Sequence, residues 1–111
     1  MSDVIYLCKT CRLENGQLPG EDFATALAER VSHLEIEVRT VACLNLCDTP
    51  MSLALRGVGK TAYLFSDVAA SDVGDAAALA GLYVAAQDGE ITDARAAGRL
   101  RHCLVGKIPA I

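Results

Sequence analysis

Four cysteines in two short-spaced pairs are the residues of this chain best suited to chemistry. Cys8 and Cys11 are separated by two residues, Cys43 and Cys47 by three, and 31 residues lie between the pairs. Thiolates are soft ligands, and they select zinc or an iron–sulfur cluster over magnesium or calcium. Two such pairs supply the four thiolates that a tetrahedral zinc site or an iron–sulfur cluster requires. The spacing therefore predicts a metal or cluster site and leaves the identity of the metal open.

Each cysteine pair follows a segment that has the pattern of a β-strand. Residues 4–7 are consecutively apolar, which is typical of a strand buried on both faces. Residues 35–41 alternate between apolar and polar side chains, which indicates a strand with one solvated face. If the two strands are parallel neighbours, both cysteine loops leave the same edge of the sheet, about 4.8 Å apart. Four thiolates can then converge on one site.

The remaining segments complete a β-α-β-β-β-α-α order. A right-handed crossover makes the first two strands parallel, and a hairpin adds two antiparallel strands. The first strand is the most apolar and should be central, whereas the second has a charged face and should be an edge. We therefore predict one α/β domain over residues 1–111, a thioredoxin-like, four-stranded mixed sheet of order 2-1-3-4 with helices on both faces. The other expected elements are a helix at 21–30, strands at 52–56 and 61–65, helices at 75–87 and 92–103, and a tail at 107–111.

Composition excludes several classes of protein. The chain has 10 Lys and Arg against 14 Asp and Glu, a net charge of −4, which makes it a poor candidate for nucleic-acid binding. No apolar run approaches the length of about 18 residues that a membrane span needs. The N-terminus lacks the basic and apolar regions of a secretory signal. We therefore expect a cytoplasmic protein whose five cysteines are reduced and whose acidic balance suits docking to the basic face of a partner protein.

The chain resembles the thioredoxin-like [2Fe–2S] ferredoxins, and more closely a small bacterial family described as predicted metal-binding proteins within that group. The cysteine spacings are the specific part of the resemblance, which covers nearly the whole chain. The residues that carry it are 4–12, Pro19-Gly20, 43–47, Tyr63-Leu64-Phe65, Leu82-Tyr83, Asp88-Gly89 and Ile108-Pro109.

The resemblance implies a [2Fe–2S] cluster on Cys8, Cys11, Cys43 and Cys47 in a protein that passes single electrons and is not an enzyme. Its redox partner protein would be a reductase or an acceptor enzyme. The related ferredoxins associate as homodimers, which implies a homodimer here. Their first cysteine pair is spread more widely than Cys8 and Cys11, so the second ligand position departs from theirs, although a tight pair can still serve one iron.

Two other functions remain open. The same four cysteines would suit a non-redox metal-binding module that holds zinc structurally or carries a metal to a client. A thiol–disulfide oxidoreductase would use Cys8 and Cys11 alone, and it needs its reactive thiol at a helix N-terminus, where the dipole lowers the thiol pKa. The expected helix begins near Gly20, nine residues after Cys11. That separation and the second cysteine pair argue against the oxidoreductase.

The remaining suggestive residues have simpler interpretations. Cys103 has no cysteine neighbour in the sequence and is expected to be a packing thiol. His33 and His102 are expected to be surface or capping residues, and Glu35 and Glu37 to lie on a solvated strand face. Small side chains at Ala76, Ala77 and Ala80 would let another element approach closely, either a second copy or the chain's own sheet. The Gly-Lys-Thr at 59–61 lies between two strands, which predicts a hairpin turn and not a phosphate-binding loop. Pro50 occupies the place of the thioredoxin fold's cis-proline, and its isomer is left open.

Overall fold

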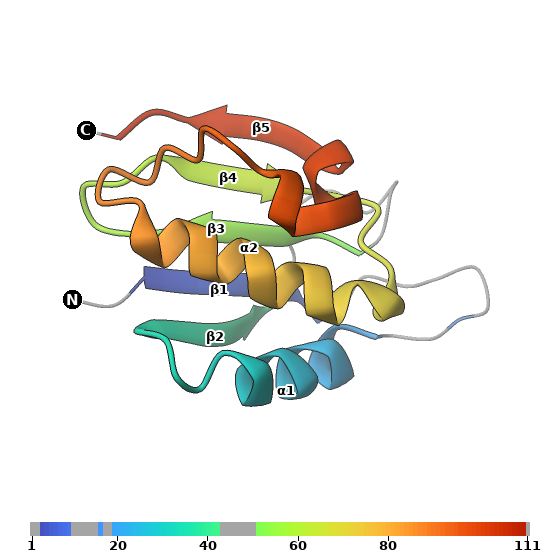
Figure 1. Ribbon diagram of the computed structural model, residues 1–111. Coiled ribbons are helices and arrows are strands. Elements are labelled where there is room, and N and C mark those ends of the chain that lie inside the picture. Colours follow the sequence, from blue (N-terminus) through green and yellow to red (C-terminus); the bar gives the residue numbers. More distant parts are fainter. Residues whose placement is uncertain (1–2, 10–15, 17–18, 43–50, 111) are drawn as a thin grey trace.

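The computed structural model describes residues 3–9, 16, 19–42 and 51–110. Within them, a five-stranded sheet has the order β2-β1-β3-β4-β5 (Figure 1). The strands are β1 (Asp3–Cys8), β2 (Ile36–Val41), β3 (Leu53–Arg56), β4 (Ala62–Phe65) and β5 (Leu104–Ile108). The α-helices are α1 (Gly20–Arg30) and α2 (Val73–Ala85), and the 3-10 helices are η1 (Ala70–Asp72) and η2 (Arg95–His102).

The first four strands have the predicted order. β1 is central, parallel to β2 and antiparallel to β3. Its Ile5 and Leu7 are fully buried, as the apolar run predicts. β2 lies at an edge, and its burial alternates so that Glu37 and Arg39 are exposed while Val38 packs against the core. The parallel pair places the C-terminal ends of β1 and β2 side by side, with Cys8 opposite Val41.

The sheet has a fifth strand where the sequence predicts the end of a helix and a tail. β5 pairs antiparallel with β4 and lies at the second edge of the sheet. Four of its five residues are exposed, so no buried face produces the apolar alternation by which a strand is recognised. The segment before it is η2 instead of an α-helix, and Gly98 interrupts it with a φ of 59°.

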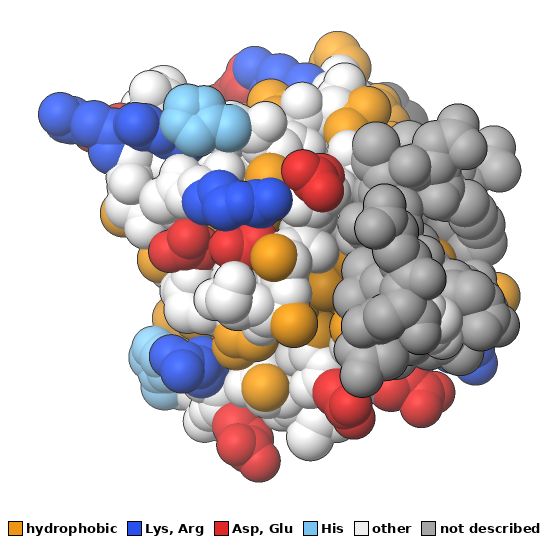
Figure 2. Space-filling view, turned by 90° about the vertical axis from the view of Figure 1, so that its right-hand side faces the viewer, with side chains coloured by type: hydrophobic (Ala, Val, Ile, Leu, Met, Phe, Trp, Pro, Cys, Tyr) orange, Lys and Arg blue, Asp and Glu red, His pale blue; other side chains and the backbone are white. Residues whose placement is uncertain are grey.

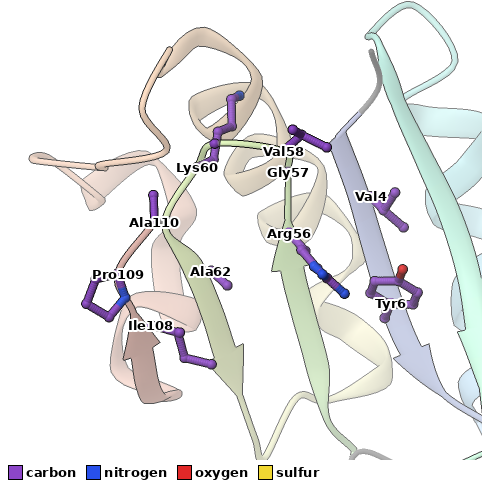
Figure 3. A pocket seen from close by; sticks show the side chains of 11 residues that line it. Val4, Tyr6, Arg56, Gly57, Val58, Lys60, Ala62, Ile108, Pro109 and Ala110 are labelled. Carbon is purple, nitrogen blue, oxygen red and sulfur yellow. The ribbon is translucent and has the colours of Figure 1, made fainter.

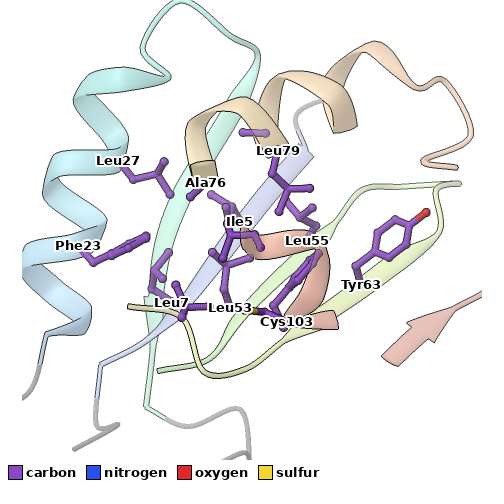
Figure 4. Packing of buried hydrophobic residues seen from close by; sticks show 14 of the residues in the cluster. Ile5, Leu7, Phe23, Leu27, Leu53, Leu55, Tyr63, Ala76, Leu79 and Cys103 are labelled. Carbon is purple, nitrogen blue, oxygen red and sulfur yellow. The ribbon is translucent and has the colours of Figure 1, made fainter. Parts of the chain in front are cut away.

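The described helices all cover one face of the sheet, which corrects the prediction of helices on both faces. Side chains of α1, α2 and η2 pack in one core against the strand residues that point to one face of the sheet. In addition, α1 contacts α2 directly. Figure 4 shows helix and strand side chains meeting in this single layer. Ala76 and Ala80 are fully buried in it, so the small residues of α2 serve the chain's own core. The labelled core residues include Phe23 and Leu27 of α1, Leu79 of α2, and Ile5, Leu7, Leu53 and Leu55 of the sheet.

The opposite face of the sheet carries no described helix. A groove of about 680 Å³ lies on this open face, where β1, β3, β4 and β5 meet the turn between β3 and β4 (Figure 3). Its lining includes half-buried Val4 and Tyr6, together with the exposed Arg56 and Ile108. Among the described residues, no helix has the length and apolar character that crossing a membrane requires.

Candidate metal centre

Cys8 is the one predicted ligand that falls within the described residues. It is the last residue of β1 and is fully buried. Its backbone N–H donates to the Ser52 carbonyl at 3.2 Å, and the N–H of Lys9 donates to the Val41 carbonyl at 2.9 Å. These two hydrogen bonds fix the end of β1 between β3 and β2. The other predicted ligands, Cys11, Cys43 and Cys47, lie outside the described residues, as does Pro50.

The structure brings Cys8 to the start of the second cysteine segment. The Cys8 Sγ lies 3.8 Å from the carbonyl oxygen of Ala42, to which the thiol donates. Ala42 immediately precedes Cys43 in the chain. The sequence predicts that the two cysteine segments follow neighbouring parallel strands at the same end of the sheet. Cys8, the first residue of one segment, and Ala42, the residue before the other, lie together there. Within the described ranges, no cluster of three or more His, Cys, Asp or Glu residues is placed to hold a metal ion.

The first residue of α1 packs directly on the backbone of Cys8. A Cβ atom added to Gly20 would overlap the carbonyl oxygen of Cys8 and lie 2.9 Å from the Cα of Lys9. Only glycine permits this approach. The positive end of the α1 dipole thus lies against the Cys8 backbone, where it favours negative charge. Cys8 therefore lies beside a helix N-terminus although the two are distant in the sequence. The distance in sequence no longer argues against the oxidoreductase hypothesis, and the second cysteine pair is the remaining argument against it.

A second group of polar side chains lies at the same end of the sheet, and the sequence reasoning missed it. The Arg99 guanidinium donates to the Asp67 carbonyl from both of its terminal nitrogens, at 3.0 and 2.8 Å. It also forms an ion pair with the buried Asp72 at 2.8 Å. The Cys103 Sγ lies 3.3 Å from Arg99 Nη1. The group joins residues 67–72 to residues 99–103, which begin 27 residues after Asp72, so no local spacing pattern could have indicated it.

Cys103 behaves as the packing thiol that the sequence predicts. Its side chain is 8% exposed and joins the hydrophobic core. Burial raises the thiol pKa above its ordinary value, and the nearby Arg99 opposes that rise only in part. A thiol that stays protonated is a poor nucleophile and a poor metal ligand. Cys103 is therefore packed in the core beside Arg99, as the sequence predicts.

The other end of the sheet is fastened by an ion pair. Lys60 Nζ lies 2.6 Å from Asp3 Oδ2 and donates to the Tyr83 carbonyl at 2.9 Å. The Tyr83 hydroxyl donates to the buried Thr61 carbonyl at 2.6 Å, and burial raises its pKa to about 12. Lys60 N also donates to the Gly57 carbonyl at 3.1 Å across the turn that joins β3 and β4. The Gly-Lys-Thr motif is thus part of a hairpin turn, as predicted.

The remaining candidates are surface residues. His33 and His102 are exposed, and Glu37 pairs with Arg39 on the solvated side of β2. Figure 2 shows the end of the molecule that lies on the right of Figure 1. On its described surface, Lys and Arg side chains stand beside Asp and Glu side chains, with small hydrophobic side chains between them. The excess of Asp and Glu over Lys and Arg is therefore not concentrated on the described part of this end.

Comparison with known proteins supports the fold. A family model described as "Protein of unknown function (DUF1636)" matches residues 5–110. A solved structure, a thioredoxin-like [2Fe–2S] ferredoxin from Aquifex aeolicus, superposes with a TM-score of 0.60 at 13% sequence identity. The alignment covers 96% of this chain and 92% of the ferredoxin. No curated protein matches the chain. At this identity the likeness shows the fold alone, and it confirms the predicted thioredoxin-like α/β class.

Proposed function

We propose that this chain, which belongs to the DUF1636 family, is a [2Fe–2S] protein that passes single electrons. Cys8, Cys11, Cys43 and Cys47 would hold the cluster. One observation carries the proposal: the buried Cys8 thiol, at the end of the central strand, reaches the carbonyl of Ala42, the residue before Cys43. Cys8 and the residue that precedes the second cysteine pair therefore lie together where β1 and β2 end.

The described residues fit such a group. A bound cluster supplies one-electron redox chemistry, and the chain supplies thiolates and their surroundings. The backbone of Cys8 is held by Ser52 and packed against Gly20, so this ligand position is rigid and closed to water on the strand side. The α1 N-terminus favours the negative charge that thiolate ligands bring. No substrate pocket is needed, and the proposed role is not enzymatic.

A non-redox metal module is the second candidate. Two residues between Cys8 and Cys11 are the spacing of many structural zinc ligands. Anaerobic purification followed by absorption and EPR spectroscopy, with iron, zinc and sulfide analysis, separates the two functions. Visible absorption with two irons and two sulfides per chain is expected for the cluster. A colourless protein with one zinc per chain would contradict the cluster proposal and establish the second candidate.

A second copy of the chain is the proposed occupant of the open sheet face. Glu37 and Arg56 have opposite charges and lie in register on either side of Val4. A two-fold axis along β1 would therefore bring each Glu37 to the Arg56 of the partner copy, with Val4 and Tyr6 packed at the axis. Arg56 has no ion pair within the described residues, so the dimer would supply one. A cytoplasmic location and a redox partner with a basic docking face belong to the same proposal.

Charge exchange tests this dimer. The wild type should sediment at twice the 11.7 kDa chain mass, whereas Arg56→Glu and Glu37→Arg should each be monomeric because like charges would face each other. An equal mixture of the two variants should form a heterodimer, since each charge then meets its opposite. Arg101→Glu, the same change on the exposed part of η2, is the matched control and should remain dimeric. A monomeric wild type, or a mixture that stays monomeric, would contradict the proposal.

A further inference from the structure

Asp67, which follows β4, has an unusual backbone conformation. Its φ of 58° makes it the single non-glycine residue with positive φ in the described part of the chain. Residues with a Cβ atom rarely adopt this left-handed conformation without support from their surroundings. The support here is the Arg99 guanidinium, because both terminal nitrogens donate to the Asp67 carbonyl oxygen.

Arg99 is itself held in place from two sides. Its Nη1 lies 2.8 Å from Asp72 Oδ2, and this buried carboxylate also accepts the backbone N–H of Ala69 at 2.8 Å. Its backbone N–H donates to Asp75 Oδ2 at 3.2 Å, directly after the break in η2 at Gly98. The guanidinium is therefore oriented by α2 and its N-terminal turn before it reaches Asp67.

The residue after Asp67 leads toward the second cysteine pair. Val68 and Met51 exchange two backbone hydrogen bonds, at 3.0 and 3.3 Å, and both side chains are almost completely buried. Met51 is the fourth residue after Cys47 and the first described residue beyond that pair. Arg99 thus fixes Asp67, Asp67 sets the direction of Val68, and Val68 holds the point at which the cysteine segment rejoins the sheet.

We infer that Arg99 is a positioning residue for the second cysteine pair, acting through the left-handed turn at Asp67 and the Val68–Met51 pair. The inference rests on the proposed metal site. Arg99 touches neither the cofactor nor a predicted ligand in the described structure. Its role is to keep Met51, the first described residue after the Cys43–Cys47 segment, in one place, which would favour a single geometry of the proposed metal site.

Replacing Arg99 with methionine tests the inference in the cofactor-loaded protein. Arg99→Met should release its cofactor to an iron chelator roughly 10-fold faster or more, the range seen when outer-shell support of metal ligands is lost. It should also change the g values of the reduced cluster, which a uniformly less stable protein would leave alone. Arg95→Met is the matched control, because Arg95 lies on the same element and its one ion pair within the described part of the chain is with the exposed Asp93. Equal release rates and identical spectra in Arg99→Met and the wild type would overturn the inference.

A second substitution separates this role from general destabilisation. Glycine adopts positive φ without cost, so Asp67→Gly in the Arg99→Met background should restore slow release and the wild-type spectrum. Asp67→Gly alone should change little, since its side chain is largely exposed. An unrestored double variant would overturn the role of the turn.

The outcome is distinguishable from failure of the proposed function. If the wild type binds zinc instead of a cluster, cobalt substitution gives an absorption spectrum on which the same variants are compared. If it binds no metal, the proposed function fails. Amide exchange at Val68 and Met51 then tests whether Arg99 supports this backbone pair. Faster exchange in Arg99→Met than in the wild type would support that role, and unchanged exchange would contradict it.

Discussion

At the end of the sheet where β1 begins, the nearly buried Lys60 forms an ion pair with Asp3 and donates a hydrogen bond to the Tyr83 carbonyl. At the end where β1 finishes, the buried Cys8 thiol donates to the Ala42 carbonyl at 3.8 Å. A glycine lets the backbone approach closely at each end, Gly57 beside Asp3 and Gly20 beside Cys8. The first end is therefore closed by charges and hydrogen bonds that the chain itself supplies.

The contacts that stabilise the sheet therefore lie at the opposite end of this domain from the proposed functional site. At the Asp3–Lys60 end, these contacts join β1, the turn between β3 and β4, and α2. The Cys8 end gathers the Cys8 thiol, the start of α1 and the Arg99 group, and it is the end at which we propose that a cofactor binds. Changes at the first end should lower stability without affecting the cofactor, and changes at the second should affect both.

The largest effect is expected from the second cysteine pair. Cys43→Ser or Cys47→Ser should remove most of the bound cofactor, because a hydroxyl is a poor substitute for a thiolate. Losing a cross-link that closes more than 30 residues should cost roughly 3–4 kcal/mol and lower Tm by roughly 10 °C or more. Metal analysis and thermal unfolding measure the two effects.

Cys103→Ser is the control for the cysteine variants. It removes a buried thiol that has no part in the predicted site, so the cofactor content should not change. Full loss of cofactor in Cys103→Ser, with the paired cysteine variants unaffected, would reverse the assignment of the two kinds of cysteine.

A comparable loss of stability, but without loss of the cofactor, is expected at the opposite end. Lys60→Met should leave Asp3 buried without a counter-charge and cost about 3–5 kcal/mol, with no change in cofactor per folded chain. Chemical denaturation measures the loss. Arg95→Met breaks an exposed ion pair and should cost less than about 1 kcal/mol. Equal costs for the two variants would remove the distinction between a closed end and a solvated surface.

The smallest of these effects is a dependence on alkaline pH. The Tyr83 pKa is raised to about 12 by burial and by the nearby Asp3, so the folded chain keeps its phenol proton where the unfolded chain has lost it. The contribution is complete below pH 10, falls as the pH rises from 10 to about 12, and amounts to roughly 2–3 kcal/mol. Tyr83→Phe should unfold with a flatter pH profile over that range. An unchanged profile would show that Tyr83 does not sense the buried environment.

The sequence was sufficient for the strands whose burial follows from their own residues. β1 is recognised by its consecutive apolar residues and β2 by its alternation, and their parallel pairing follows from the crossover rule. β5 was missed because an exposed edge strand has no buried face to reveal it. The side on which a helix packs is set by how the layers fit together, which is why the second helical layer was predicted and is not found among the described helices.

The candidate site was predictable to the extent that it is local in sequence. The cysteine pairs stand out by spacing, and the position of Cys8 beside Ala42 follows from strand pairing. The Arg99 group was not predictable, because it depends on a turn at Asp67, a break at Gly98 and the packing of η2 on α2. None of these leaves a regular pattern in the sequence.

The central position of β1 also has a consequence for synthesis of the chain. β1 is the first strand to leave the ribosome, yet its two neighbours are made much later, since Ile5 pairs with Val38 on one side and Leu55 on the other. Chains are made from the N-terminus, so the most apolar strand stays unpaired until β2, which ends at Val41, has been made, and it lacks its second neighbour until β3 ends at Arg56. The nascent chain therefore exposes the centre of its future sheet for longer than any other strand, and this is the interval in which a chaperone would be most useful.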